Sequence, residues 1–325
     1  MKAVRMHVRA GPEALVYEDA PAPKIGSEEV LVRVRAAGVT PTEFTWNSTF
    51  TARDKRSRLP IIPAFEVAGI VEKIGSLTSG MAEGDAVYGL LDFWRDGAAA
   101  EYVVARAHEL APKPESLSFA YAAAVPLSGL TAWQSLFDYA NLSEGNTVLV
   151  HGAGGGVGTF AVQFAHRRGA HVFATCSREK VDFVRSLGAD RVIDYSRVRF
   201  QDELGELDVV LDTVGGEVLE NSWKVLRPGG SLVTIVGDAP EETAARYGVK
   251  GFSILVEPNR KELVEIARVI DAGEVKPVVD AVFPLSRARE AYERGLRGHN
   301  RGKIVLKVGN GDELAESRQA LRDNV

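Results

Sequence analysis

The sequence predicts an α/β fold in two domains, a twisted β-barrel or sandwich and a doubly wound parallel sheet. Three observations support this prediction. Short strand patterns separated by proline and glycine occupy the chain up to residue 114. From about Ala120 onward, strand patterns alternate with helical patterns. Finally, 325 residues, 45% of them hydrophobic, are too many for one ordinary core and suit two domains.

The first domain is predicted from strands in which apolar and polar residues alternate. A period of two is typical of strands with one buried face. A series of such strands joined by short turns favours a barrel or a sandwich. The predicted strands lie in residues 2–8, 28–39, 64–75, 84–90 and 98–114.

The second domain is predicted from strands that are almost wholly apolar and are followed by helices. Residues 120–140, rich in Ala and Leu, have a helical pattern and open the series. This alternation predicts a parallel sheet covered by helices on both faces. The predicted strands lie in residues 147–153, 171–177, 191–195, 207–214, 231–236 and 251–255, with helices over 157–169, 179–188 and 261–272.

The pattern also predicts where the domains divide. We expect residues 124–267 to form the parallel-sheet domain. Residues 1–123 and 268–325 should form the β-domain, because the strand texture of the beginning resumes in RGKIVLKV near the end. Residues 309–325 are polar and charged, and we expect them to form a tail.

The sharpest motif is a glycine-rich loop. The apolar strand Val148–Val150 is followed by five glycines within residues 152–158 and then by an apolar helix. A helix N-terminus offers unpaired N–H groups and a positive dipole end, which suit a pyrophosphate. A tight turn without a ligand is the alternative, but the flanking strands and helix favour a Rossmann dinucleotide site. Its loop residues are Ala153, Gly154, Gly155, Gly156, Val157 and Gly158, with alanine where the fingerprint has its first glycine.

The end of the second strand predicts the choice of nicotinamide cofactor. Sites that prefer NAD place Asp or Glu about 20 residues beyond the glycines, to bind the ribose 2′-hydroxyl. Ser177 stands there instead, followed by Arg178 and Lys180. Cations beside a small hydroxyl suit a 2′-phosphate, although Arg178 and Lys180 could equally be exposed residues of the next helix. Glu179 is the one acid nearby. The segment favours NADP(H).

Composition excludes several other classes. A net charge of −5 argues against nucleic acid as a partner, and the basic run 53–58 is short. No apolar run is long enough to span a membrane, and the N-terminus has no signal-peptide pattern. With Cys176 as the single cysteine, neither an internal disulfide nor a cysteine-built zinc site is possible. These features lead us to expect a cytoplasmic protein.

The motifs together resemble a known family. VLVHGAGGGVG, AAAVPLSGLTAW, PAFEVAGIVEKIG, GDAVYGL, LGADRVIDY, DTVGG and RGKIVLKV are similar to segments of the zinc-independent quinone oxidoreductases, the zeta-crystallin-like branch of the medium-chain dehydrogenase/reductase superfamily. The resemblance covers residues 1–308. It implies a GroES-like β-domain joined to the Rossmann domain, and an NADPH-dependent reductase.

The resemblance also implies a set of cofactor contacts. Ser177, Lys180 and Tyr195 would meet the 2′-phosphate, and Thr131 would lie near the nicotinamide ribose. The remaining contacts implied for the nicotinamide end are Val214, Val236, Gly237, Phe252, Ser253 and Ile254.

The implied substrate segment runs from Thr40 to Trp46. Thr40 and Glu43 stand where a commoner form of the branch has asparagine and aspartate, which leaves the substrate open. Glu43 is either a surface carboxylate or a site residue. The aromatic residues Trp46, Phe93 and Trp94 are either core residues or a wall that stacks on a flat substrate, and we favour the wall.

The metal ligands of the zinc-dependent relatives are missing. Ala64-Phe65-Glu66 stands where those relatives have Gly-His-Glu, so phenylalanine replaces the ligand histidine. The expected catalytic cysteine is also absent, since Val39-Thr40-Pro41 occupies its segment. Zinc needs three or four N, S or O ligands, so we expect no metal.

The predicted reaction is hydride transfer from NADPH to a quinone or to the activated C=C bond of an enone. The product anion must then gain a proton, and the hydroxyls of Thr40 and Thr131 are the candidate donors. An acryloyl thioester or an alkenal is an alternative acceptor. A non-catalytic NADPH-binding protein, structural or sensory, is the alternative from another class. We also expect a homodimer, because residues 251–255 form an apolar edge strand without proline or charge.

Overall fold

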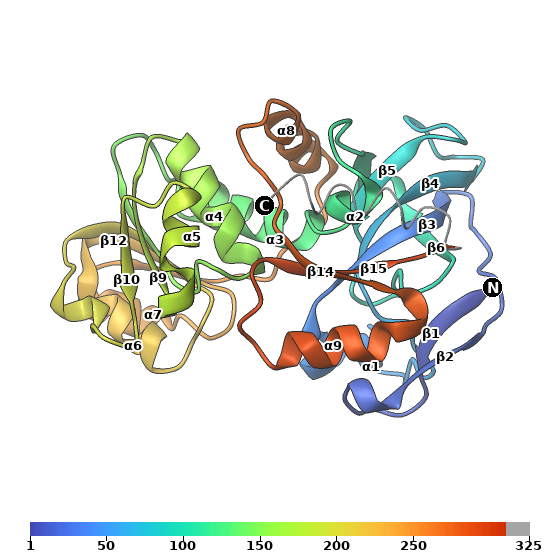
Figure 1. The fold of residues 1–325 in the computed structure, drawn as a ribbon, viewed down its shortest axis with the longest axis horizontal. Coiled ribbons are helices and arrows are strands. Elements are labelled where there is room, and N and C mark those ends of the chain that lie inside the picture. Colours follow the sequence, from blue (N-terminus) through green and yellow to red (C-terminus); the bar gives the residue numbers. More distant parts are fainter. Residues whose placement is uncertain (310–325) are drawn as a thin grey trace. The chain divides into compact units, whose positions relative to one another are not determined.

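The computed structural model describes residues 1–309 and divides them into two compact units (Figure 1). Unit 1 comprises residues 1–127, 258–272 and the chain from 279 onward; unit 2 comprises residues 128–257 and 273–278. Except for Gly309, the predicted tail lies outside the described residues. No helix in the described part is long and apolar enough to cross a membrane.

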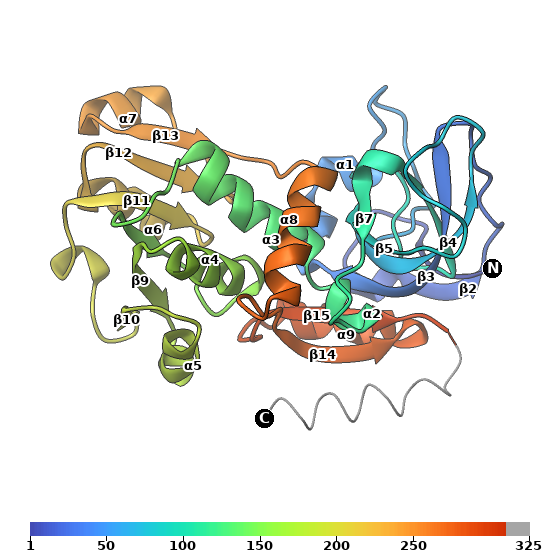
Figure 2. The same cartoon turned by 90° about the horizontal axis from the view of Figure 1, so that it is seen from above.

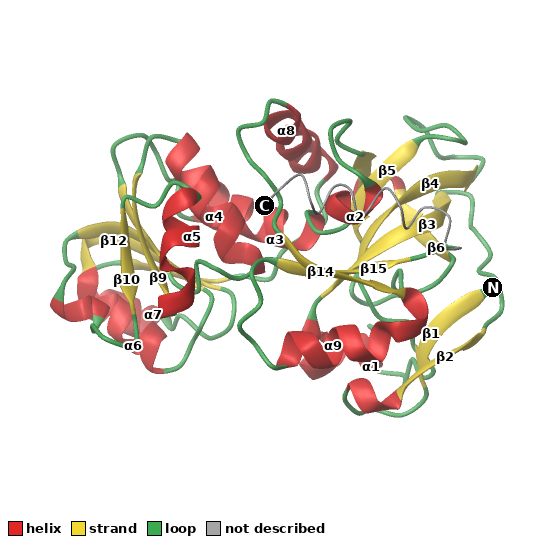
Figure 3. Cartoon of the chain, in the orientation of Figure 1, coloured by secondary structure: helices red, strands yellow, loops and turns green. Residues whose placement is uncertain are grey.

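Unit 1 is built mainly of strands (Figure 3). A seven-stranded sheet has the order β14-β15-β3-β4-β5-β7, with β6 paired to β3, and β1 and β2 form a separate antiparallel pair. All pairs are antiparallel except β14 with β15. The strands are β1 (Lys2–Met6), β2 (Leu15–Asp19), β3 (Glu29–Val39), β4 (Glu66–Ile74), β5 (Ala86–Leu90), β6 (Tyr102–Arg106), β7 (Leu110–Pro112), β14 (Val279–Pro284) and β15 (Lys303–Lys307). The helices are α1 (Asn47–Phe50), α2 (Phe119–Ala122), α8 (Arg260–Asp271) and α9 (Ala288–Leu296).

Unit 2 contains the predicted parallel sheet. Its strand order is β10-β9-β8-β11-β12-β13, and every pair is parallel. Numbered from β8, this is the Rossmann order 3-2-1-4-5-6. Helices α4 and α5 cover one face and α6 and α7 the other (Figure 2). The strands are β8 (Thr147–Val150), β9 (His171–Cys176), β10 (Arg191–Asp194), β11 (Leu207–Asp212), β12 (Leu226–Thr234) and β13 (Lys250–Ser253); the helices are α4 (Gly156–Arg167), α5 (Val181–Ser186), α6 (Glu217–Ser222) and α7 (Glu241–Tyr247).

The predicted helical segment 120–140 is not one helix. After α2, α3 (Pro126–Trp133) begins at a proline, which is tolerated in the first turn because its missing N–H would have no partner there. The segment then continues as a π-helix over Gln134–Tyr139. Proline inside the pattern thus separates two helices that hydrophobicity alone does not distinguish.

Helix α8 belongs to unit 1, whereas the boundary expected at residue 267 assigned most of it to the parallel-sheet domain. Hydrogen bonds at both ends of the helix and in between hold it there. The Tyr88 hydroxyl donates to the Leu263 carbonyl at 2.6 Å, and the Arg260 guanidinium donates to the Leu110 carbonyl at 2.6 Å. At the other end of the helix, the Asp271 carboxylate accepts from the Ser116 backbone and side chain.

Candidate active site

The glycine loop joins β8 to α4 in a conformation that requires two of its glycines. Gly152 has φ +66°, which non-glycine residues rarely adopt. At Gly158 a Cβ atom would lie 2.3 Å from the Gly152 carbonyl oxygen and 2.6 Å from the Ala153 Cα. The first turn of α4 therefore packs directly on the loop, as the fingerprint predicts.

The N-terminus of α4 is open to an anion. Gly155 is the N-cap and has no side chain with which to cap the helix. The first N–H groups of a helix have no partner within it, and they carry the positive end of the helix dipole. The Ala153 amide is already bound to the Thr175 carbonyl at 3.1 Å, which ties the loop to β9. The geometry fits the pyrophosphate of a dinucleotide.

A row of exposed apolar side chains follows the carboxyl ends of the strands. Tyr195 follows β10 and is 60% exposed, while Val214 follows β11 and Val236 follows β12, each 52% exposed. Leu255, two residues beyond β13, is 67% exposed. Exposed apolar side chains on one sheet edge are typical of a ligand surface, and dinucleotides bind at this edge of Rossmann sheets.

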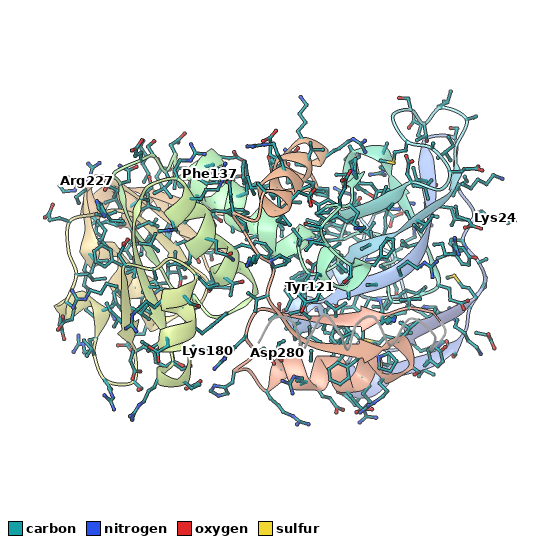
Figure 4. All side chains as sticks on the ribbon, turned by 45° about the horizontal axis from the view of Figure 1, so that its top comes forward. Lys24, Tyr121, Phe137, Lys180, Arg227 and Asp280 are labelled. Carbon is teal, nitrogen blue, oxygen red and sulfur yellow. The ribbon has the colours of Figure 1, made fainter. Side chains whose placement is uncertain are left out.

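The four residues predicted to recognise a 2′-phosphate lie at the ends of two paired strands. Cys176 at the end of β9 is in register with Asp194 at the end of β10, and the Tyr195 amide donates to the Cys176 carbonyl at 3.3 Å. Ser177 and Tyr195 are thereby brought side by side. Arg178 is exposed, whereas Lys180, which is labelled in Figure 4, is buried with its methylene groups against Gly154.

Glu179 contacts one of the residues that are predicted to recognise the 2′-phosphate. The Ser177 hydroxyl donates a hydrogen bond to the Glu179 carboxylate. The negative charge of the Glu179 carboxylate therefore lies beside the Ser177 hydroxyl, which is expected to meet the phosphate. An incoming phosphate would have to displace that carboxylate toward solvent, where Glu179 is exposed.

The nicotinamide contacts implied by the resemblance also lie in unit 2. Val236 and Gly237 follow β12, and Phe252 and Ser253 end β13. The Ile254 amide donates to the Thr234 carbonyl at 3.0 Å, so the chain remains paired one residue past the strand. The Thr131 side chain in α3 is buried, and its carbonyl accepts from the Ser135 hydroxyl at 2.6 Å.

His151 lies beside the glycines as a buried, neutral side chain. Its Nδ1 lies 2.9 Å from the Thr175 hydroxyl and its Nε2 lies 3.1 Å from the Ser222 hydroxyl. Ser222 already donates to the Val218 carbonyl, so this network assigns the proton to Nε2. Burial lowers the pKa of His151 to about 3. The geometry supports a strand-end role over acid–base catalysis.

Cys176 is likewise inert. The residue is buried, and burial raises the pKa of its thiol to about 11. A reactive cysteine needs a lowered pKa and access to its partner, and Cys176 has neither. Cys176 is a small residue that fills the end of β9.

In unit 1, Thr40 lies at the end of β3 against two charged residues from the neighbouring strands. Glu66 opens β4 and Lys303 opens β15, and both strands pair with the end of β3. The Lys303 ammonium donates to the Thr40 Oγ1 at 3.1 Å and forms an ion pair with Glu66. Both charged side chains are buried.

Glu43 is neither a surface carboxylate nor a residue that a substrate can reach. Its side chain is fully buried, with one carboxylate oxygen bonded to the Tyr292 hydroxyl and the other 3.1 Å from the Ala64 amide. Burial raises the pKa of this carboxyl to about 8. The short 3-10 helix over Pro41–Thr45 turns Glu43 toward the core, so it holds the segment in place and is closed to direct contact with a substrate.

The aromatic side chains form a cluster of three rings. Trp46 lies 5.2 Å from Phe93 and 6.3 Å from Phe65, and Phe65 lies 5.3 Å from Phe93, as ring-centroid distances. Phe65 and Phe93 are buried, whereas Trp46 is half-buried and forms the open side of the cluster. Trp94 lies apart, with the Arg53 guanidinium 5.5 Å from its ring.

Sequence reasoning missed Lys303 and Tyr292. Both look ordinary along the chain, since Lys303 stands at the start of an apolar strand and Tyr292 in an amphipathic helix. Their partners are more than 200 positions away: Thr40 and Lys303 are separated by 263 residues, and Glu43 and Tyr292 by 249. One local signal existed for Glu66, an acid inside an otherwise apolar strand pattern. Within residues 1–309, no three His, Cys, Asp or Glu side chains are grouped so that they could hold a metal ion.

Comparison with known proteins is consistent with both units. Residues 26–115 match the family described as alcohol dehydrogenase GroES-like domain, and residues 187–306 the family described as zinc-binding dehydrogenase. The 2-methylene-furan-3-one reductase of Solanum lycopersicum is 38% identical over 295 residues, which cover 87% of this chain and 73% of that protein. The NADPH-dependent alkenal/one oxidoreductase, chloroplastic, of Arabidopsis thaliana is 37% identical with the same coverage.

A solved structure extends the likeness to the whole fold. The quinone oxidoreductase from Coxiella burnetii has a TM-score of 0.86 and 31% sequence identity, covering 95% of this chain and 99% of that one. The chain therefore belongs to the quinone and enone oxidoreductases of the medium-chain dehydrogenase/reductase superfamily. The predicted combination of a GroES-like domain and a Rossmann domain is confirmed.

Proposed function

We propose that this protein is an NADPH-dependent reductase that delivers hydride to a quinone or to the activated C=C bond of an enone, without a metal. The observation that carries the proposal is the carboxyl edge of the unit 2 sheet. There the open N-terminus of α4, the row of exposed apolar side chains and the Ser177–Lys180 segment offer contacts for each part of a dinucleotide.

The cofactor supplies the hydride, and the residues of the chain supply orientation and a proton. The loop Ala153–Gly158 holds the pyrophosphate by its backbone, and Thr131, Val236 and Phe252 orient the nicotinamide. Trp46 of unit 1 presents an aromatic face to a flat acceptor. The hydroxyl of Thr40 protonates the anion that hydride addition leaves.

The test is to follow NADPH oxidation with quinones, enones, alkenals and an acryloyl thioester as acceptors. Turnover with a quinone or an enone supports the proposal. Tight NADPH binding with no turnover on any acceptor would instead indicate a non-catalytic NADPH-binding protein.

The cofactor preference is tested by reversing one charge. We expect NADPH to bind at least about tenfold more tightly than NADH, a difference of about 1.4 kcal/mol, and Lys180→Glu to remove or reverse that preference. The new carboxylate would repel the 2′-phosphate and could accept from a ribose hydroxyl. Affinities from fluorescence titration with each cofactor measure the ratio. Glu179→Gln is the matched variant: it removes the carboxylate on Ser177 and should favour NADPH further. Equal affinities in the wild type would disprove the assignment.

The acceptor surface is tested at Trp46. Trp46→Ala should raise KM several-fold for aromatic acceptors, because stacking on an indole contributes about 0.5–1.5 kcal/mol beyond area burial. NADPH affinity should stay unchanged, since the dinucleotide contacts lie in unit 2. Thr131→Val should lower kcat for every acceptor alike. If Trp46→Ala weakens NADPH binding as much as acceptor use, Trp46 is a packing residue.

Metal independence is supported by the surroundings of Phe65. The side chain that replaces the ligand histidine is buried against Phe93 and Trp46, an apolar setting that offers no metal donors. Loss of activity on chelation, with one zinc per chain by elemental analysis, would contradict it.

Two further proposals concern assembly and location. We expect a homodimer, because β13 is an edge strand of the parallel sheet and Leu255 just beyond it is exposed. Light scattering that gives the mass of one chain would contradict this.

A cytoplasmic location is supported by the lone, buried Cys176, and cell fractionation tests it.

A further inference from the structure

Lys303 is a buried cation whose position the proposed roles do not yet explain. It opens β15, and the residue is 6% exposed. Its ammonium contacts two groups, the Glu66 carboxylate and the Thr40 hydroxyl oxygen. A buried ammonium needs a counter-ion, and Glu66 provides it. The bond to Thr40 is additional to that need.

The bond to Lys303 determines what the Thr40 hydroxyl can do. A threonine hydroxyl has one proton to donate and two lone pairs that accept. Lys303 has no acceptor site, so Thr40 must be the acceptor in this pair, at 3.1 Å. The Thr40 proton is then directed away from Lys303, and within residues 1–309 the structure records no hydrogen bond donated by this hydroxyl. Because Thr40 is half-buried, that proton can reach a bound molecule, whereas the ammonium behind it cannot.

The neighbouring groups fix this arrangement in place. The second Glu66 oxygen accepts from the Leu127 amide at 3.0 Å, which fixes the carboxylate beside Lys303. Glu43 and Tyr292 are the other titratable groups of the cluster. The charge on Lys303 acts to lower the pKa of Glu43, while Glu66 acts to raise it. Thr40, Glu43, Glu66, Tyr292 and Lys303 thus form one polar cluster at the end of β3.

We propose that Lys303 is the proton source behind Thr40, so that the two residues act as a relay. The inference rests on the proposed function. Hydride addition places an electron pair on the acceptor as an enolate or hydroquinone anion. The Thr40 O–H bond breaks as its proton passes to that anion, and the hydroxyl regains a proton from the Lys303 ammonium. The neutral amine then regains a proton from water through the half-buried Thr40 hydroxyl once the product has left, so each turnover consumes one NADPH and one proton.

The relay is distinguished from a structural role by Lys303→Arg. Arginine keeps the positive charge beside Glu66, but its guanidinium does not release a proton in proteins. We expect this variant to retain its unfolding midpoint and its NADPH affinity while losing at least about tenfold in kcat, 1.4 kcal/mol in barrier. The loss should appear in kcat, while KM for the acceptor stays unchanged. Lys307→Arg, at the other end of β15, is the matched control and should leave kcat unchanged.

A second variant covers the risk that the buried pair is needed for folding. The double variant Glu66→Gln with Lys303→Met leaves no unpaired charge and should fold, yet show the same loss of kcat. Full activity in Lys303→Arg or in the double variant would overturn the relay and leave Lys303 as the counter-ion of Glu66. Absence of turnover in the wild type with every acceptor would overturn the proposed function itself.

Discussion

Gly158→Ala is expected to abolish dinucleotide binding and to destabilise unit 2. The added Cβ would lie 2.3 Å from the Gly152 carbonyl oxygen and 2.6 Å from the Ala153 Cα. Both atoms are backbone, so the strain cannot be relieved by a rotamer change. Overpacking of this kind costs about 1–3 kcal/mol, and the loop proposed to bind the pyrophosphate is the part that must move. We expect NADPH affinity to fall by more than about a hundredfold, equivalent to 2.7 kcal/mol, in a fluorescence titration.

Substitutions at two other glycines distinguish a loss of NADPH affinity caused by destabilisation from one caused by obstruction of the binding loop. At Gly155 a Cβ would meet only the Gly152 carbonyl oxygen, at 3.3 Å. Gly155→Ala should therefore leave the unfolding midpoint nearly unchanged and still weaken NADPH binding, because Gly155 is the N-cap of α4, where the proposed function places the pyrophosphate. At Gly205 a Cβ would meet nothing within 4 Å, so Gly205→Ala should change neither quantity. Wild-type affinity in Gly158→Ala would show that the loop is not the pyrophosphate site.

The Rossmann half of the molecule could be predicted from sequence because its signals are local. A strand, five glycines and a helix follow one another within residues 147–167, and the contacts at Gly158 are made inside the same loop. The alternation of strands and helices, with right-handed crossovers, leaves few possible sheet orders. The proximity of Ser177 and Tyr195 follows in turn, since each comes after the end of one of two adjacent strands.

The buried polar cluster of unit 1 could not be predicted, because its members meet only through topology. Glu66 and Lys303 become neighbours because β4 and β15 flank the end of β3. A glutamate in a loop such as Glu43 reads as exposed, since charged residues rarely lie fully buried unless they are paired. Only the fold shows that Tyr292 and the Ala64 amide provide its partners. The amphipathic pattern of residues 261–272 likewise predicts the helix α8, but it does not predict the surface against which the helix packs.

Stability should fall as the pH rises from about 6.5 to about 8, and Glu43→Gln should remove that fall. Between about 4.5 and 6.5 the lowered pKa of buried His151 contributes a rise in stability that opposes the contribution of Glu43. Burial raises the pKa of Glu43 in the folded chain to about 8, from 4.5 as its ordinary value. Between these values the folded state holds a proton that the unfolded state has released. The contribution of Glu43 to the free energy of unfolding is therefore full below pH 4.5 and is lost as the pH rises to 8. The contribution of this one group to the free energy of unfolding changes by about 1.4 kcal/mol per pH unit at most.

Glutamine is the matched replacement because it keeps the shape and both contacts. Its amide oxygen can accept from Ala64 and its amide nitrogen can donate to Tyr292, but it cannot ionise. Between about pH 6.5 and 8, denaturant midpoints should therefore decline less for Glu43→Gln than for the wild type, and the variant should overtake the wild type toward alkaline pH. Tyr292→Phe should act in the opposite direction, since the hydroxyl helps to lower the pKa of Glu43, and its loss extends the decline to higher pH. Glu290→Gln, an exposed site on the same helix whose pKa is lowered by Arg287, should leave the slope in this range unchanged. Parallel profiles for Glu43→Gln and the wild type would mean that Glu43 stays ionised in the folded chain, with Lys303 balancing two carboxylates instead of one.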